Sequence, residues 1–130
     1  MRALFLDDMS ERHRQFKSKH SKEFEHVDYV YTYDDAVKYL KSHTYNAVFL
    51  DHDLSENAIM CDPDDIDERT GADLAIWIVQ NMETEDAPGF VIHSLNPVGR
   101  ERMVNLLRDA GFDASGIPFY ILCNPDIPLL

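Results

Sequence analysis

Short apolar runs alternate with longer segments of mixed polarity along this chain. The runs contain few polar positions and are rich in β-branched and aromatic side chains, which is typical of strands buried on both faces of a parallel sheet. We expect five strands, within residues 2–8, 26–33, 46–51, 89–94 and 117–123.

The segments between these runs carry helix signals. Helices are predicted at 10–21, 34–42, 71–82 and 97–110, the last with Asn96 as N-cap, Pro97 in its first turn and Gly111 after its end. Regular strand–helix alternation predicts an α/β fold with a doubly wound, parallel five-stranded sheet. At this length we expect one domain over residues 1–130 and the flavodoxin-like strand order 2-1-3-4-5.

An acidic, proline-containing connection at about 54–70 interrupts this alternation. Connections of this length without secondary structure are uncommon in compact domains unless they are functional or mobile. We interpret it as a lid over a site, while a partner-binding loop and a solvated linker remain open alternatives.

The net charge of −12 disfavours a protein that binds duplex DNA, because such proteins need a basic surface. Five of the twelve lysines and arginines nevertheless lie within residues 12–22, so a small anionic ligand can still find positive charge. The two cysteines, Cys61 and Cys123, have neither metal-site spacing nor a disulfide framework. No apolar run approaches a membrane span, and we expect a cytoplasmic protein; the oligomeric state stays open.

Polar side chains gather where three of the expected strands end. In the order 2-1-3-4-5 these ends are neighbours, so their carboxylates would repel one another unless a cation lies between them. The hard divalent ions Mg²⁺ or Mn²⁺ suit oxygen ligands, whereas ordinary polar strand ends are the alternative interpretation. The predicted metal ligands are Asp7, Asp8, Asp51 and Asp53.

Two strings resemble motifs of two-component receiver domains. "LFLDD" at 4–8 resembles their acidic pair, and "VFLDHDL" at 48–54 resembles the segment around their phospho-acceptor aspartate. The resemblance covers nearly the whole chain and implies a receiver-like fold. It also implies that Asp8 and Asp51 bind metal with support from Asp7, and that Ser94 holds the hydroxyl position after the fourth strand.

The chain departs from receivers at one position. They carry a lysine before a proline after the fifth strand, where this chain has Asn124 before Pro125, and no lysine follows Lys41. An aspartyl phosphate would therefore lack a main source of stabilisation. The strings "LDHDL" and "HSLNPVG", with Arg12 after the first acids, are similar to the divergent cyclic-phosphate processing receivers, which implies a nucleotide or RNA cyclic phosphate as the ligand.

The candidate catalytic residues are His93, His52 and Asp51. His52 lies between two acids that would raise its pKa, which suits a general acid or a phosphate contact. Its alternative is a strand-end residue turned into a helix layer, and that of His93 is a core histidine with satisfied hydrogen bonds. Four further histidines lie in surface-type segments and receive no role: His13, His20, His26 and His43.

The candidate phosphate contacts are Ser94, Asn96, Arg100 and Arg12. A hydroxyl, an amide and a helix N-terminus together can hold an anion, and arginine can bind phosphate with two hydrogen bonds. Plain helix capping and solvated helix faces explain the same residues without a ligand.

These residues favour a Mg²⁺- or Mn²⁺-dependent phosphoesterase that acts on the cyclic phosphate of a nucleotide or an RNA end. Two alternatives remain. One is a phospho-accepting response-regulator receiver, and the other is a non-catalytic module that binds and sequesters a nucleotide.

Overall fold

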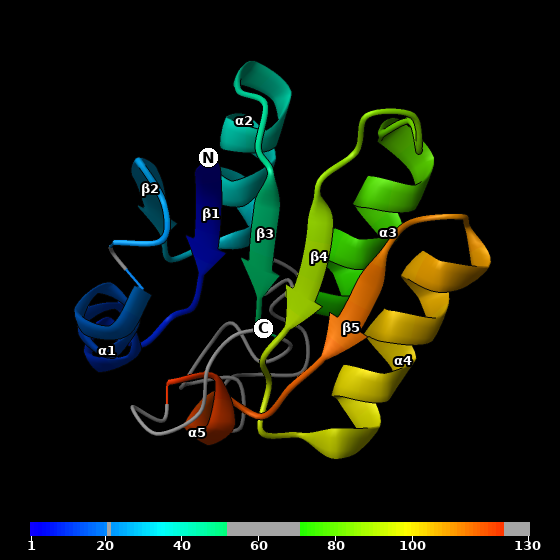
Figure 1. Cartoon of the computed structure of the whole chain (residues 1–130). Coiled ribbons are helices and arrows are strands. Elements are labelled where there is room, and N and C mark those ends of the chain that lie inside the picture. The colour runs from blue at the N-terminus through cyan, green and yellow to red at the C-terminus, as the bar shows by residue number, and fades with distance from the viewer. Residues whose placement is uncertain (21, 52–70, 124–130) are drawn as a thin grey trace.

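The computed structural model describes residues 1–20, 22–51 and 71–123, and contains the expected five-stranded parallel sheet in the order β2-β1-β3-β4-β5 (Figure 1). The strands are β1 (Arg2–Leu6), β2 (His26–Val30), β3 (Ala47–Leu50), β4 (Gly89–Ile92) and β5 (Ala114–Gly116). The helices are α1 (Ser10–His20), α2 (Tyr33–Ser42), α3 (Gly71–Asn81), α4 (Pro97–Asp109) and α5 (Phe119–Leu122). The predicted fold class and strand order are confirmed.

Alternation along the strands divides the core into two layers. Leu4 and Leu6 of β1 face the cluster that packs against α2, α3 and α4, whereas Ala3 and Phe5 face the cluster with α1 and α5. This period of two follows from the strand pleat, and both faces are apolar because helices cover both of them. Buried polar residues therefore follow the carboxyl ends of β1, β3 and β4, where the site lies.

The fifth strand is not where the sequence predicted it. We expected a strand at 117–123, but β5 is Ala114–Gly116, and Phe119–Leu122 is a short helix. Pro118 cannot donate a hydrogen bond to a strand ladder, and it precedes this helix directly. Phe119 and Leu122, three residues apart, then pack as one helix face on the α1 side of the sheet.

The predicted cap of α4 is confirmed, and α2 also has a side-chain cap. Thr32 caps α2 by accepting a hydrogen bond from the Asp35 backbone, at 3.1 Å. Asn96 caps α4, with Pro97 in the first turn, and Gly111 follows the helix with a φ of 97°. Within the described part of the chain, no helix combines the length and apolar composition needed to cross a membrane.

Candidate functional site

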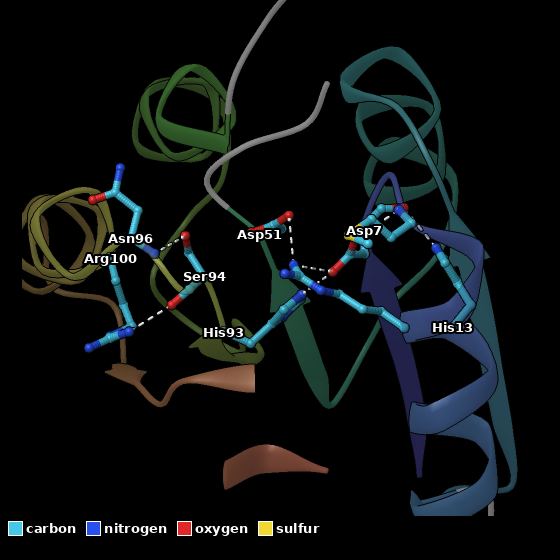
Figure 2. Close-up of polar contacts among 9 residues, drawn as sticks. Asp7, His13, Asp51, His93, Ser94, Asn96 and Arg100 are labelled. Carbon is cyan, nitrogen blue, oxygen red and sulfur yellow. Dashed lines mark hydrogen bonds and ion pairs between the residues drawn. The ribbon is translucent and has the colours of Figure 1, made fainter. Parts of the chain in front are cut away.

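Three buried polar residues meet at the carboxyl ends of β1, β3 and β4. Asp7, Asp51 and His93 each follow the last residue of their strand, and the parallel register places these strand ends side by side. One ligand atom from each of the three lies within 4.8 Å of the others (Figure 2). We call these three residues the acidic group. Its members have exposed fractions of 0%, 2% and 0%, so water screens their charges little.

Arg12, from the first turn of α1, lies against both acids of this group. One nitrogen of its guanidinium is 3.2 Å from Asp7 Oδ2 and 3.4 Å from Asp51 Oδ2. The guanidinium also lies 5.1 Å from the centre of the Phe119 ring. Its charge therefore relieves part of the repulsion for which the sequence analysis invoked only a metal ion.

The sequence predicted Arg12 as a phosphate contact and missed this pairing with the acids. The available signal was an arginine in the first turn of the helix that follows Asp7, where a long side chain can return to the end of the strand. Its role toward phosphate remains a prediction.

His93 and Asp7 form a fully buried pair, with His93 Nε2 3.0 Å from Asp7 Oδ2. Burial, the largest influence, lowers the pKa of His93, and the neighbouring Asp7 carboxylate opposes it only in part. Burial acts to raise the pKa of Asp7, but His93, the Met9 backbone N–H and Arg12 together lower it. At neutral pH we therefore assign a neutral imidazole that donates from Nε2 to an ionised Asp7.

The His93 ring is held firmly but is not a fully satisfied core histidine. It stacks on Phe5, with ring centres 4.9 Å apart and planes 7° from parallel. Its Nδ1 is buried and has no hydrogen-bond partner among the described residues. Nε2 is thus hydrogen-bonded to Asp7, while Nδ1 makes no hydrogen bond with the described residues.

Two histidines that the sequence analysis placed at the surface are buried, so that assignment was wrong. His13 is 5% exposed and its Nε2 lies 2.7 Å from the backbone oxygen of Asp7. His20 is fully buried between the Glu23 carboxylate and the Leu122 backbone oxygen. Both lie on the inner side of α1, which the many charged residues of this helix obscured in the sequence.

The polar side chains after β4 form hydrogen bonds with nearby backbone groups of the same segment. Ser94 Oγ accepts a hydrogen bond from the Asn96 backbone, and Asn96 Oδ1 accepts one from the Gly99 backbone. Arg100 donates to the Ser94 backbone oxygen at 2.6 Å, on the side of Ser94 away from Asp51 in Figure 2. These contacts match the capping alternative, and phosphate binding by Ser94, Asn96 and Arg100 remains a prediction.

The remaining predicted residues either lie outside the acidic group or fall outside the residues that the structure describes. Asp8 is half-buried next to Asp7 but does not belong to the acidic group. His52, Asp53, Asn124 and the connection at 54–70 lie outside the described residues.

The acidic group suits a divalent cation by its chemistry. Two carboxylates from neighbouring strands offer the hard oxygen ligands that Mg²⁺ and Mn²⁺ prefer, and an imidazole nitrogen is better tolerated by Mn²⁺. With His93 neutral, the two carboxylates and Arg12 sum to one net negative charge among the described residues of the group. That charge favours a cation and repels a free phosphate anion.

Comparison with known proteins agrees with this site at the end of a receiver-like sheet. Residues 2–109 match the family described as the cyclic-phosphate processing receiver domain. The chain belongs to this family. No curated protein matches the sequence significantly.

Solved structures of receiver domains share the fold of this cyclic-phosphate processing receiver. A CheY-like receiver from Methylobacillus flagellatus is 21% identical, with a TM-score of 0.65 over 91% of this chain and 85% of that one. TrrA from Thermotoga maritima, solved with Mg²⁺-BeF, is 19% identical, with a TM-score of 0.65 over 90% and 84%. The Mn²⁺-bound response regulator Rcp1 is 14% identical, with a TM-score of 0.62 over 90% and 79%.

The buried histidines predict a pH-dependent stability. The pKa values of His93 and His13 lie below the ordinary 6.5 in the folded protein, so the unfolded chain binds protons at higher pH. Their contribution to the free energy of unfolding is complete above the pKa of the unfolded chain. It is lost as the pH falls through that pKa toward the lower pKa values of the folded protein. With EDTA present, we expect the free energy of unfolding to fall by up to about 1.4 kcal/mol per pH unit for each histidine below about pH 6.5.

Urea unfolding at a series of pH values measures this slope. His93→Gln should make it shallower, because one of the two histidines no longer titrates. An identical slope in His93→Gln and the wild type would show that the folded His93 titrates normally.

The position of Arg12 predicts that it competes with a divalent cation. Arg12→Gln removes a positive charge beside Asp7 and Asp51, so it should raise Mg²⁺ affinity by about tenfold or more while lowering metal-free stability by about 2 kcal/mol. Thermal unfolding against Mg²⁺ concentration measures both effects. Arg14→Gln changes the same net charge on an exposed side of α1 and serves as the control. Equal or weaker Mg²⁺ binding by Arg12→Gln would refute the competition.

Proposed function

We propose that this protein is a divalent-metal-dependent phosphoesterase that opens the cyclic phosphate of a nucleotide or of an RNA end. The observation that carries the proposal is the buried acidic group, in which Asp7 and Asp51 share Arg12 and Asp7 also binds His93. Membership of the cyclic-phosphate processing family supports the choice of substrate class.

Charge is the first reason for a metal requirement. A cyclic phosphate is an anion, and the two buried carboxylates outweigh Arg12, so the site on its own repels the substrate. Asp7 and Asp51 would hold Mg²⁺ or Mn²⁺, with Asp8 and Asp53 as further predicted ligands. The ion would supply Lewis-acid polarisation of the phosphate and a more acidic water. Arg12 would then be released from part of its pairing and could contact a phosphate oxygen.

The second requirement is a proton for the departing ribose oxygen. His93 is neutral before substrate binds, because burial lowers its pKa. An anionic phosphate beside the ring would raise that pKa and favour protonation, after which the ring could donate the proton. Asp7 would position the ring throughout, through the 3.0 Å contact with Nε2. His52 is the second candidate for the same role, and Ser94, Asn96 and Arg100 are the candidate contacts for the rest of the phosphate.

The test is a hydrolysis screen of cyclic mononucleotides, cyclic dinucleotides and RNA 2′,3′-cyclic phosphate ends, with Mg²⁺, with Mn²⁺ and with EDTA. For any substrate found, Asp51→Asn should lose metal affinity and turnover together, because it removes a ligand and a charge. His93→Gln and His52→Ala remove candidate proton donors, so we expect the essential one of them to lower kcat by about 10²–10⁴ with metal binding largely kept.

Asp109→Asn provides the matched control, since Asp109 is an exposed acid at the far end of α4 and its loss should change nothing. Wild-type turnover in both histidine variants would remove the acid–base assignment. If no cyclic phosphate is turned over under any metal condition, the phosphoesterase proposal is refuted, and the nucleotide-sequestering module becomes the better explanation.

A phospho-accepting receiver is the second candidate. Asp51 lies at the end of β3 in a receiver fold, and Arg12 places a fixed positive charge 3.4 Å from it. Arg12 is shared with Asp7, however, and no lysine follows Lys41 in the chain.

We therefore expect that acetyl phosphate with Mg²⁺ leaves no long-lived aspartyl phosphate on this protein. The physical reason is that no lysine follows Lys41 in the chain, so a phosphoryl group on Asp51 lacks the fixed lysine charge that stabilises it in receivers. Intact-mass measurement over time decides the matter. A persistent phosphoryl adduct that disappears in Asp51→Asn would favour the receiver over the phosphoesterase.

A further inference from the structure

An open groove lies between α1 and the edge strand β2, next to the acidic group. Its volume is about 550 Å³, within the range of roughly 300–1,000 Å³ that small-molecule sites occupy. The residues that line it are Ser10, His13, Arg14, Lys17, Tyr29 and Tyr31. We call this the α1–β2 groove.

The groove contains a supported aromatic surface. Tyr31 is 42% exposed, and one side of its ring stacks on His13, with ring centres 4.1 Å apart. His13 is held by its 2.7 Å contact with the Asp7 backbone oxygen and by the edge-on contact with Phe5. The Tyr31 ring is thus backed by a buried imidazole and presents its remaining surface to solvent, which suits stacking of a planar base.

The charge of the groove is opposite to that of the molecule. The chain carries a net charge of −12, but among the described residues the side chains that line the groove include Arg14 and Lys17 and no acid. These two residues are three positions apart on α1, so they project from the same side of the helix. The groove therefore combines an aromatic ring with two cations, which is the pairing that single-stranded nucleic acids require.

The groove and the acidic group share a wall. Consecutive residues of α1 serve the two sites, because Arg12 binds Asp7 and Asp51 while His13 binds the Asp7 backbone oxygen and lines the groove. His13 Nδ1 is buried and has no partner among the described residues.

We propose that the α1–β2 groove binds the nucleotide next to the phosphate that reacts at the acidic group. The substrate class is then a single-stranded RNA end of two or more nucleotides, with a base on Tyr31 and a backbone phosphate at Arg14 and Lys17. The assignment of the reacting phosphate rests on the proposed function, whereas binding in the groove can be measured without turnover.

The experiment measures fluorescence anisotropy of a labelled single-stranded tetraribonucleotide with a 3′-hydroxyl end, in EDTA, against the full chain, so that no terminal phosphate has to enter the metal-free acidic group. Tyr31→Ala should weaken binding about tenfold, in line with loss of one base stack, and Tyr31→Phe should retain affinity because the ring remains. Lys17→Gln should weaken binding and make the dependence of log affinity on log salt shallower by about 0.7, whereas Lys38→Gln, exposed on α2, should do neither.

Circular dichroism and thermal unfolding verify that Tyr31→Ala is folded, and Lys17→Gln tests the groove without altering the ring. If the wild type fails to bind the RNA, or if Tyr31→Ala and Lys17→Gln both bind it as tightly as the wild type, the proposal is overturned even if cyclic mononucleotides are hydrolysed. If the variants bind RNA as expected but no cyclic phosphate is hydrolysed, the RNA-binding groove is supported and the phosphoesterase proposal is refuted.

Discussion

Two buried carboxylates of like charge, Asp7 and Asp51, impose the constraint on which the site depends. Ionised groups removed from water are unstable unless opposite charges and hydrogen bonds surround them. This chain meets the requirement with the Arg12 guanidinium, the His93 ring and the Met9 backbone N–H. Each compensating group comes from a different part of the chain, so the charge balance also ties α1 and β4 to the end of β1.

Helix α1 covers the sheet and also supplies residues to both the acidic group and the α1–β2 groove. Its successive residues point to different surroundings, with Arg12 toward the acids, His13 beneath Tyr31, and Phe16 in the core against Phe5. A rotation or shift of this helix would disturb the charge balance and the α1–β2 groove together. The two sites are therefore physically connected through the helix and through the backbone oxygen of Asp7.

A shared fold does not decide the chemistry, because many activities use the same α/β sheet and differ only in the residues at the strand ends. Here the receiver-like acids are joined by a fully buried histidine in contact with Asp7 and by an arginine placed between the two carboxylates. Such a group can hold a cation and orient an imidazole, and the proposal adds a phosphate contact from Arg12. Those capacities distinguish the proposed phosphoesterase from a switch that only stores a phosphoryl group.

The sequence by itself determined the fold class, the strand order and the convergence of Asp7, Asp51 and His93, because these follow from local apolar patterns and from the geometry of parallel sheets. It also located the cap of α4, which depends on neighbouring residues alone. Its placement of the last strand failed because a short apolar run with a proline is compatible with strand or helix, and packing on the core decided between them.

Only the tertiary structure decided which charges are paired. The contact of Arg12 with both acids, the burial of His13 and His20, and the groove beside Tyr31 depend on how α1 is seated on the sheet. A charged helix carries no periodic signal strong enough to identify its few inward residues, and the direction of a long side chain is set by partners distant in sequence. Local patterns therefore specify the elements, and the partners of the polar side chains emerge only when those elements pack.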